Sequence, residues 1–360
     1  MFFECETGEK IMIDRRYHAI GIIGFGARGQ LLAETIGSEL PEYGRVAAVA
    51  DTRQNLLFRQ GVGIYCHDFK VYRDYRELLA DEEIDTVIIE TYPESHLEIT
   101  AAAIRAGKAV MCDKPAVPSL ADAAEMYRVV TSTPCAFQMG LNMPCRPALI
   151  KAKELLAEGA VGKVFSVRGL CDVGYAFAHD VILRKFAGDP AGLILGKLTH
   201  DTDFMQYALG TYAEEVCGFS ANFQHRRHGT GETSDDTAVI CGVMHDGTLF
   251  SQALTSCGSA YSRKFTFFGE KGELCVDGKE NFVEIVTSSG SRKRFDVEAG
   301  SGGHGGADKL LLSSFLDYVD SRTGKPRWPE RICSSVMIPL AAMERTVVHT
   351  GAWYRGIVGD

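Results

Sequence analysis

The feature of the sequence that most constrains its fold is a glycine-rich stretch between a strand pattern and a helix pattern. Residues 19–23 form a short apolar run, as expected of a strand buried on both faces of a parallel sheet. Gly24-Phe25-Gly26-Ala27-Arg28-Gly29 follows directly and leads into a helical pattern at residues 31–36. A second apolar run, residues 46–50, ends at Asp51. This order, with an acid about 20 residues beyond the glycines, is typical of a dinucleotide-binding unit.

The residue types in this stretch suit the binding of a pyrophosphate. Gly24 permits a tight turn, Gly26 lets the backbone approach the phosphates, and Gly29 allows the helix to pack closely on the strand. The helix N-terminus adds backbone N–H donors and the positive end of its dipole. We therefore assign cofactor binding to the six motif residues, Gly24, Phe25, Gly26, Ala27, Arg28 and Gly29. Glycines that serve only a turn are the structural alternative.

The acid at the end of the second strand bears on the choice of cofactor. Asp51 is expected to accept hydrogen bonds from the adenosine ribose hydroxyls. Its negative charge would repel the 2′-phosphate of NADP, so the sequence favours NAD. Arg53 keeps NADP as the alternative, because a nearby arginine can accommodate that phosphate.

Strand and helix patterns alternate as far as about residue 141, which indicates a parallel sheet covered by helices on both faces. Beyond this point one helix is followed by long strands with turn signals, and the chain ends in helical patterns. We predict an α/β chain in three parts. These are an N-terminal tail at residues 1–16, a Rossmann domain with a doubly wound parallel sheet at 17–141, and a substrate-binding α+β domain with a large open, mainly antiparallel sheet at 142–360.

The composition argues against several classes of function. The net charge of −9 disfavours a nucleic acid or an anionic membrane as partner, because phosphates are met by an excess of Lys and Arg. No apolar stretch approaches the roughly 20 residues of a membrane helix, and the first residues lack the pattern of a signal peptide. The eleven cysteines include no CxxC pair. We therefore expect a cytoplasmic protein with reduced thiols and no metal site.

A lysine follows a later strand of the predicted parallel sheet. Asp113-Lys114-Pro115 comes directly after the apolar run at residues 109–112. Ligands of such sheets bind beyond the carboxyl ends of the strands. Lys114 could therefore donate a hydrogen bond to a reacting oxygen and stabilise negative charge on it. A surface lysine before a turn is the alternative.

A second polar cluster stands at what the pattern indicates is the start of a helix. It contains Lys197, His200, Asp201 and Asp203. A histidine near a helix N-terminus is pushed toward its neutral form, which a general base at physiological pH needs. A structural histidine, or a metal site on His200, Asp201 and Asp203, are the alternatives. The segment before this cluster contains three further candidates for substrate binding, although ordinary loop surface would also explain them: Tyr175, His179 and Arg184.

Several segments together resemble the Gfo/Idh/MocA family of oxidoreductases, from about Tyr17 to Gly351. Residues 106–115 look like the family's AGKxVxxEKP segment, with Asp in place of the usual Glu. Residues 159–164 are similar to its GxIGxV segment, and residues 269–274 match its GxxGxL turn. The resemblance implies a C-terminal open sheet through which subunits form a homo-oligomer.

The resemblance also implies roles for single residues. Lys114 would lie beside the nicotinamide, and His200 would be the acid/base near the substrate hydroxyl. His96 fits a family position near the cofactor, although helix capping or packing would also explain it, and Thr91 joins the cofactor-binding candidates.

The second cluster departs from the common family pattern DxGxHxxD. Gly196 and Leu198 stand where the family has Asp and Gly, so the cluster looks like a subgroup with KxxHDxD. That subgroup also tends to carry HGGxD, here residues 304–308, although we expect His304 to hold a loop rather than to catalyse. Lys197 would then take over a charge-stabilising or substrate-orienting role.

We predict an NAD-dependent dehydrogenase that oxidises a secondary hydroxyl of a sugar, glycoside or polyol. The favoured reaction is oxidation at C3 of a glucoside, which would initiate breakdown of O- or C-glycosides. Asp201 or Asp203 would orient His200 or bind a sugar hydroxyl. The alternatives are a redox-neutral NAD-dependent glycosidase, an inositol or free-sugar dehydrogenase, and a non-catalytic nucleotide sensor.

Overall fold

The glycine motif lies in a turn between a buried strand and a helix of a parallel sheet. The computed structural model describes residues 2–4, 10–12, 16–53, 69–174, 192–223, 235–321 and 324–359. Its six-stranded sheet has the order β5-β4-β3-β6-β7-β8, with every pair parallel. The strands are β3 (His18–Ile23), β4 (Gly44–Ala50), β5 (Lys70–Tyr72), β6 (Thr86–Ile89), β7 (Ala109–Asp113) and β8 (Phe137–Gly140). The strand order reverses between β3 and β6, and such a reversal is where open parallel sheets bind ligands.

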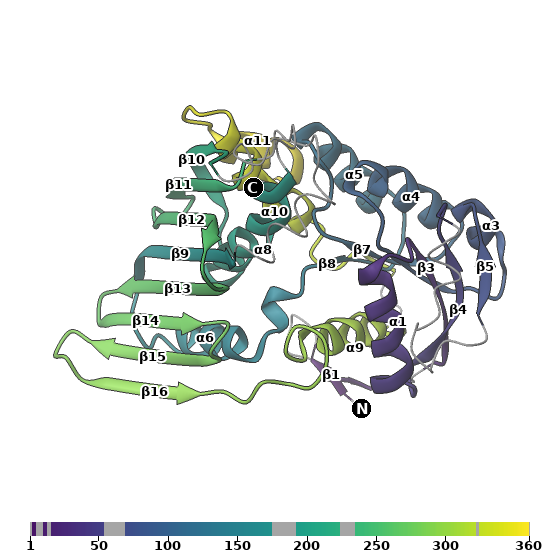
Figure 1. Cartoon of the computed structure of the whole chain (residues 1–360), viewed down its shortest axis with the longest axis horizontal. Coiled ribbons are helices and arrows are strands. Elements are labelled where there is room, and N and C mark those ends of the chain that lie inside the picture. The colour runs from purple at the N-terminus through teal and green to yellow at the C-terminus, as the bar shows by residue number, and fades with distance from the viewer. Residues whose placement is uncertain are drawn as a thin grey trace. The chain divides into compact units, whose positions relative to one another are not determined.

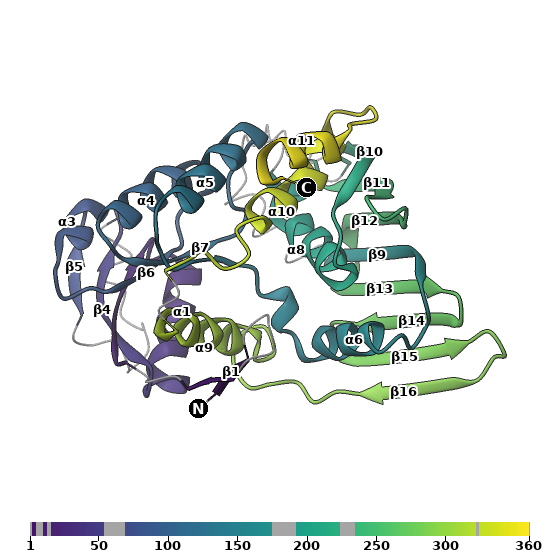
Figure 2. The same cartoon turned by 180° about the vertical axis from the view of Figure 1, so that it is seen from behind.

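Helices cover both faces of this sheet, as the alternating pattern predicts. They are α1 (Ala27–Glu39), α3 (Tyr75–Ala80), α4 (Pro93–Arg105), α5 (Leu120–Ser132) and α9 (Ala307–Asp320). Figures 1 and 2 show α1 and α9 side by side on one face, with α4 and α5 on the other. A short antiparallel pair, β1 (Phe2–Glu4) and β2 (Lys10–Met12), precedes the sheet.

Helix α9 comes from far along the chain, yet it belongs to this unit. The chain divides into a unit of Met1–Val117, Ala121–Asn142 and Ser301–Ile332, and a second unit of the remaining residues. This division differs from the expected single domain at residues 142–360. The reason is that both ends of α9 are tied to the β3–α1 segment, since Asp308 pairs with Arg28 and Asp320 pairs with His18.

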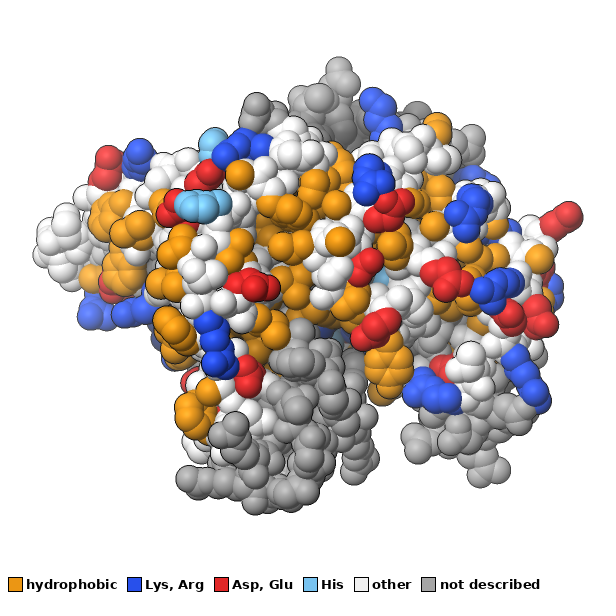
Figure 3. All heavy atoms as spheres, turned by 90° about the horizontal axis from the view of Figure 1, so that it is seen from above, with side chains coloured by type: hydrophobic (Ala, Val, Ile, Leu, Met, Phe, Trp, Pro, Cys, Tyr) orange, Lys and Arg blue, Asp and Glu red, His pale blue; other side chains and the backbone are white. Residues whose placement is uncertain are grey.

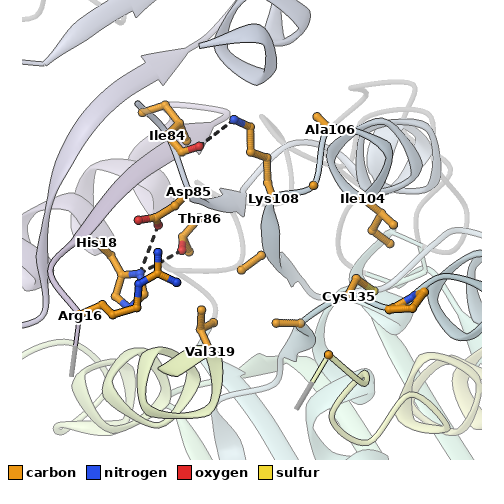
Figure 4. Close-up of a pocket in the computed structure, with 15 residues that line it drawn as sticks. Arg16, His18, Ile84, Asp85, Thr86, Ile104, Ala106, Lys108, Cys135 and Val319 are labelled. Carbon is orange, nitrogen blue, oxygen red and sulfur yellow. Dashed lines mark hydrogen bonds and ion pairs between the residues drawn. The ribbon is translucent and has the colours of Figure 1, made fainter. Parts of the chain in front are cut away.

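The His18 pair lies at the amino edge of the sheet, beside a pocket that Figure 4 shows in close-up. The imidazole is buried between two carboxylates, with Nδ1 at 3.2 Å from Asp85 and Nε2 at 3.1 Å from Asp320. Burial opposes the charge on the ring, but Asp85 and Asp320 outweigh it and raise the pKa of His18 above 6.5. The ring therefore joins the sheet to α9 as a cation.

This pair predicts a stability that falls in mildly alkaline solution. The folded state holds the His18 proton more tightly than the unfolded state. The stabilisation from protonated His18 is therefore complete below about pH 6.5, the pKa of histidine in the unfolded chain. It is lost as the pH rises through the higher pKa of the folded state. The free energy of unfolding in urea, measured from pH 6 to pH 9, should decrease, and less so in Asp320→Asn. An equal decrease in the variant would rule out this origin.

The second unit is built on an eight-stranded sheet of order β10-β11-β12-β9-β13-β14-β15-β16. Only β12 and β9 pair in parallel, so the predicted mainly antiparallel sheet is confirmed. The strands are β9 (Val164–Gly174), β10 (Ala213–Ala221), β11 (Thr237–Met244), β12 (Leu249–Gly258), β13 (Ser262–Gly269), β14 (Gly272–Asp277), β15 (Phe282–Thr287) and β16 (Arg292–Asp296). Its helical segments are η1 (Met143–Cys145), α6 (Pro147–Ala157), α8 (Gly192–Leu209), α10 (Arg331–Met343) and α11 (Thr350–Val358).

One face of this sheet is covered, and the other is open. Helices α6 and α8 pack against the covered face. Side chains alternate accordingly: Ile240 is fully buried, whereas the neighbouring Val239 is 59% exposed. Phe219 and Leu249 share the face of Val239 by strand register and are also exposed. The open face therefore presents apolar side chains.

The surface carries charges of both signs. Figure 3 shows one face on which basic and acidic side chains are interspersed among apolar ones. None of the helices in the described part of the chain is both long and apolar enough to span a membrane.

Candidate active site

The turn after β3 leaves room only for glycine at two of its motif positions. Gly24 has a left-handed φ of 93°, and a Cβ there would lie 2.6 Å from the backbone of Glu90. A Cβ on Gly29 would lie 2.3 Å from the carbonyl oxygen of Gly24. At Gly26, in contrast, an added Cβ would meet only the Arg53 side chain, at 3.4 Å. The backbone at Gly26 is therefore open to a close ligand, as a pyrophosphate would require.

Helix α1 begins immediately after this opening. Gly26 is its N-cap residue and offers no side-chain hydrogen bond to the first turn. No acidic residue stands in that turn. The helix N-terminus thus combines N–H donors with the positive end of the dipole, an arrangement that suits an anionic group. The residues present fit the phosphates of a dinucleotide.

Asp51 lies beside this turn, and it is already bonded within the protein. Its Oδ2 accepts a hydrogen bond of 2.9 Å from the Phe25 N–H, and its Oδ1 accepts one of 2.8 Å from the Arg53 N–H. The Arg53 guanidinium reaches both oxygens, at 3.1 and 3.0 Å. Burial opposes the charge, but these hydrogen bonds outweigh it and lower the pKa of Asp51. Asp51 is therefore an anion partly neutralised by Arg53.

The side chain of Arg28 turns to another partner. Its guanidinium donates hydrogen bonds of 2.7 and 2.9 Å to the two carboxylate oxygens of Asp308. The Arg28 side chain is therefore engaged within the protein, while its backbone N–H stands in the first turn of α1. Asp308 belongs to the HGGxD segment at residues 304–308, and the sequence did not indicate that this segment contacts the glycine motif.

His96 and Thr91 brace the turns that follow β6 and β7. His96 is buried, with Nδ1 at 3.0 Å from the Pro115 carbonyl and 3.1 Å from that of Ala116. Its Nε2 lies 3.1 Å from the Thr91 carbonyl. Burial lowers the pKa of His96, although the contacts with these carbonyls oppose the decrease. These contacts fix the turn that carries Lys114.

Lys114 occupies the carboxyl end of β7 and is half-buried. The glycine motif and Asp51 follow β3 and β4 at the same edge of the same sheet. The carboxyl ends of parallel strands meet at one edge of a sheet, so Lys114 stands at the same edge as the glycine motif and Asp51. Lys114 therefore follows a buried strand of the parallel sheet, and its role at a cofactor remains a prediction.

Helix α8 begins earlier than the sequence indicates. It starts by Gly192, so Lys197 and His200 lie inside the helix rather than in its first turn. The expectation that a helix N-terminus holds His200 neutral is therefore wrong. Gly196 is helical because the residues around it are buried, and this burial outweighs the low helix propensity of glycine.

Asp201 and Asp203 are buried in the second unit. Both side chains are at most 1% exposed. The Asp201 carboxylate lies 3.0 Å from Nε of Arg263 on β13, which the sequence analysis did not single out. Burial raises the pKa of Asp201 to about 6, although Arg263 opposes the increase. Asp201 therefore pairs with β13 of the sheet beneath α8.

Three predicted substrate-binding residues, Tyr175, His179 and Arg184, lie outside the described residues. Within the described ranges, no group of His, Cys, Asp or Glu side chains is arranged to hold a metal ion. The alternative metal site on His200, Asp201 and Asp203 is accordingly not supported.

Comparisons with known proteins identify both units. The NAD-binding Rossmann domain of the GFO/IDH/MocA oxidoreductase family matches residues 18–141, and the family's C-terminal domain matches residues 149–275. Myo-inositol 2-dehydrogenase of Thermotoga maritima is 26% identical over 289 residues, which cover 76% of this chain and 79% of that protein. A 1,5-anhydro-D-fructose reductase of Ensifer adhaerens is 30% identical over 204 residues, which cover 55% of this chain and 58% of the reductase.

Solved structures have the same fold over nearly the whole chain. Scyllo-inositol dehydrogenase of Lactobacillus casei, with bound NAD(H) and scyllo-inositol, superposes with a TM-score of 0.77 at 20% identity, covering 93% of this chain and all of that one. A levoglucosan dehydrogenase in complex with NADH and levoglucosan gives a TM-score of 0.78 at 19% identity, with the same coverage. The two family models together span more than half of the sequence. The chain therefore belongs to the GFO/IDH/MocA family of oxidoreductases, and its first unit contains the family's NAD-binding Rossmann domain.

Proposed function

We propose that the protein is an NAD-dependent dehydrogenase that oxidises a secondary hydroxyl of a sugar, glycoside or polyol. The observation that carries this proposal is the shared sheet edge of the glycine turn, Asp51 and Lys114. An ammonium group beside a dinucleotide site suits a reaction that develops negative charge on oxygen. The names of the relatives, an inositol dehydrogenase among them, support the substrate class.

In the proposed mechanism, NAD supplies the hydride acceptor when bound. His200 accepts the hydroxyl proton, while a hydride leaves the carbinol carbon and a ketone forms. The Nζ group of Lys114 donates a hydrogen bond to the reacting oxygen and stabilises its negative charge, with help from Lys197. Tyr175, His179, Arg184 and Asp203 are proposed to bind the other hydroxyls. Each sugar hydroxyl needs such a polar partner in a pocket.

We further propose that the preferred substrate is a glycoside, which is oxidised at C3. The motivation is the combination of the KxxHDxD pattern at residues 197–203 with HGGxD at residues 304–308. A 3-keto group acidifies the neighbouring C–H and prepares elimination of the aglycone. Oxidation of an inositol is the second candidate, which the similarity to inositol dehydrogenases favours.

A substrate panel tests both the proposed dehydrogenase activity and the proposed preference for C3 of a glycoside. Purified protein with NAD would be offered inositols, free sugars, and O- and C-glucosides, with NADH followed by absorbance and products identified by NMR. Loss of two hydrogens at C3 of a glucoside is expected. Turnover of inositols alone would overturn the glycoside proposal, and release of aglycone without net NADH would indicate a redox-neutral glycosidase.

The Asp51–Arg53 pair predicts how the cofactor preference can be changed. We propose NAD as the natural cofactor, because the Asp51 carboxylate lies beside the glycine turn, where it would repel a 2′-phosphate. In Asp51→Asn the charge that repels a 2′-phosphate is gone while Arg53 remains, so the ratio of kcat/KM for NAD over NADP should fall about tenfold or more, as for the loss of a charged contact. Arg53→Ala should raise the same ratio. Steady-state kinetics with both cofactors would check this, and unchanged ratios would contradict it.

The open face of the eight-stranded sheet suggests how copies associate. We propose a homo-oligomer in the cytoplasm, formed through the face that exposes Phe219, Val239 and Leu249. Exposed apolar patches of this kind mark interaction surfaces. Analytical ultracentrifugation should show an oligomer that Phe219→Glu with Val239→Lys dissociates, and a monomeric wild-type protein would refute the proposal.

A further inference from the structure

The carboxylate of Asp308 collects hydrogen bonds from three separate parts of the first unit. Two come from the Arg28 guanidinium in the first turn of α1, at 2.7 and 2.9 Å. Nδ2 of Asn142, which follows β8, donates a third at 2.9 Å. His304 Nδ1 lies 2.7 Å away, on the loop before α9. The Asp308 side chain is fully buried, so this cluster is an internal junction at the carboxyl edge of the sheet.

The charges at this junction hold Arg28 in one place. Burial disfavours the charged carboxyl, but His304 and Arg28 outweigh it and hold the pKa of Asp308 well below its usual range. A two-point guanidinium–carboxylate pair has a defined geometry as well as strength. Nε of Arg28 also lies 4.0 Å from Glu90, which follows β6. Arg28 is thus fixed between α9 and the sheet, and with it the first turn of α1.

The loop before α9 is shaped to bring His304 back to Asp308. Gly302, Gly305 and Gly306 have φ values of 85°, 67° and 86°, and His304 itself has a φ of 53°. A residue other than glycine is disfavoured in the left-handed region, so contacts of its side chain must hold it there. The Nδ1 atom of His304 lies 2.7 Å from Asp308 and 3.5 Å from Nη1 of Arg28.

We propose that Asp308 is a positioning residue for dinucleotide binding. Through Arg28 it holds the first turn of α1 in the arrangement that receives the pyrophosphate, and through Asn142 and His304 it joins this turn to β8 and to the loop before α9. The inference rests on the proposed dinucleotide site at Gly24–Gly29. It gives the HGGxD segment a role in cofactor binding that the sequence alone did not assign.

Asp320 provides a matched control on the same helix. Both aspartates are on α9, both side chains are fully buried, and each pairs with a cation of the β3–α1 segment. Asp308 does so at the carboxyl edge of the sheet, where the glycine motif lies, and Asp320 at the amino edge. Asp308→Asn and Asp320→Asn should therefore both lower the melting temperature, while only the first should impair dinucleotide binding.

The experiment measures binding directly by calorimetry on the full chain, with NAD and with ADP-ribose as probes. For Asp308→Asn, Kd should rise on the order of tenfold to a hundredfold for both probes, because a displaced binding turn loses its aligned contacts. Asp320→Asn should leave both values unchanged. Arg28→Lys keeps the charge but not the two-point geometry, so its Kd for both probes should rise in the same way. This variant replaces Asp308→Asn in the experiment if Asp308→Asn does not fold.

Equal Kd values in Asp308→Asn and Asp320→Asn would overturn the proposal, and so would wild-type binding in Arg28→Lys. Failure of the proposed function would be seen in the wild-type protein instead of in these variants. A wild-type protein that binds NAD but oxidises nothing in the panel would refute the substrate assignment alone, and one that binds neither probe would refute the dinucleotide site itself.

Discussion

Replacing Lys114 with methionine is expected to lower kcat by a factor on the order of 10²–10³. The physical reason is that methionine keeps much of the apolar stem but removes the charge that stabilises the developing negative oxygen. The loss should fall on kcat more than on KM for the substrate, because that charge exists mainly in the transition state. Steady-state kinetics with a turned-over substrate from the panel would measure it.

Lys108 is the natural control, because it stands at the opposite end of the same strand. Its Nζ donates hydrogen bonds of 2.9 and 2.7 Å to the carbonyls of Asp81 and Ile84 (Figure 4 shows the second). Lys108→Met should lower the free energy of unfolding by about 1–3 kcal/mol, since buried acceptors lose their partner. Its kcat should stay at the wild-type value. If His200→Ala and Lys114→Met both turned over at the wild-type rate, the catalytic assignment would be wrong.

The first unit could be predicted closely because its signals are local. The strand before Gly24, the turn, the helix after it and Asp51 all lie within a short stretch, and each is required by the same backbone geometry. The position of Lys114 follows from the same rule, since it comes directly after a buried strand. Burial of β3, β6 and β7 on both faces makes their apolar runs unambiguous.

The contacts of α9 could not be predicted in this way. Arg28 and Asp308 are 280 residues apart, and nothing in either segment specifies the other as its partner. His18 and Asp320 are similarly distant, at 302 residues. A motif such as HGGxD shows that a loop is unusual, but only the folded chain shows which charge it meets. The assignment of residues 301–332 to the first unit depends on these distant pairs.

The start of α8 was misjudged for a different reason. Two glycines, Gly192 and Gly196, suggest a loop, because glycine weakens a helix interior by about 1 kcal/mol relative to alanine. In the structure the intervening Leu193, Ile194 and Leu195 are all buried. Burial of one leucine or isoleucine contributes roughly 1.5–3 kcal/mol, which exceeds the cost of a glycine. Tertiary packing therefore outweighs the low local helix propensity and makes this segment helical.

The ion pair beneath α8 should dominate the stability of the second unit. Arg263 is 4% exposed, and its Nε lies 3.0 Å from the Asp201 carboxylate. Its two terminal nitrogens contact sulfur atoms, Met143 Sδ at 3.2 Å and Cys171 Sγ at 3.3 Å. Arg263→Met is expected to lower the free energy of unfolding by about 3–5 kcal/mol, because it removes the ion-pair partner of the buried Asp201 carboxylate. Chemical denaturation followed by fluorescence would measure the loss.

The neighbouring residue on β13 gives a matched control. Lys264 also pairs with an aspartate, Asp277, at 3.0 Å, but its side chain is 45% exposed. Lys264→Met should therefore cost only about 0–1 kcal/mol, as is usual for an exposed pair. A loss as large as that of Arg263→Met would show that burial is not what makes the Arg263 pair important.

The pH dependence of the Arg263→Met variant identifies the cause of its instability. Asp201 already has a pKa of about 6 in the folded protein, above the unfolded value of 3.8, so its burial as an anion costs stability as the pH rises through this range. Without Arg263 the folded pKa rises further, and the destabilisation should be larger at pH 8 than at pH 5. Asp201→Asn added to Arg263→Met should recover much of the loss at pH 8, since the amide carries no charge. A destabilisation that is independent of pH, and that Asp201→Asn does not relieve, would attribute the effect to lost packing instead of an unpaired charge.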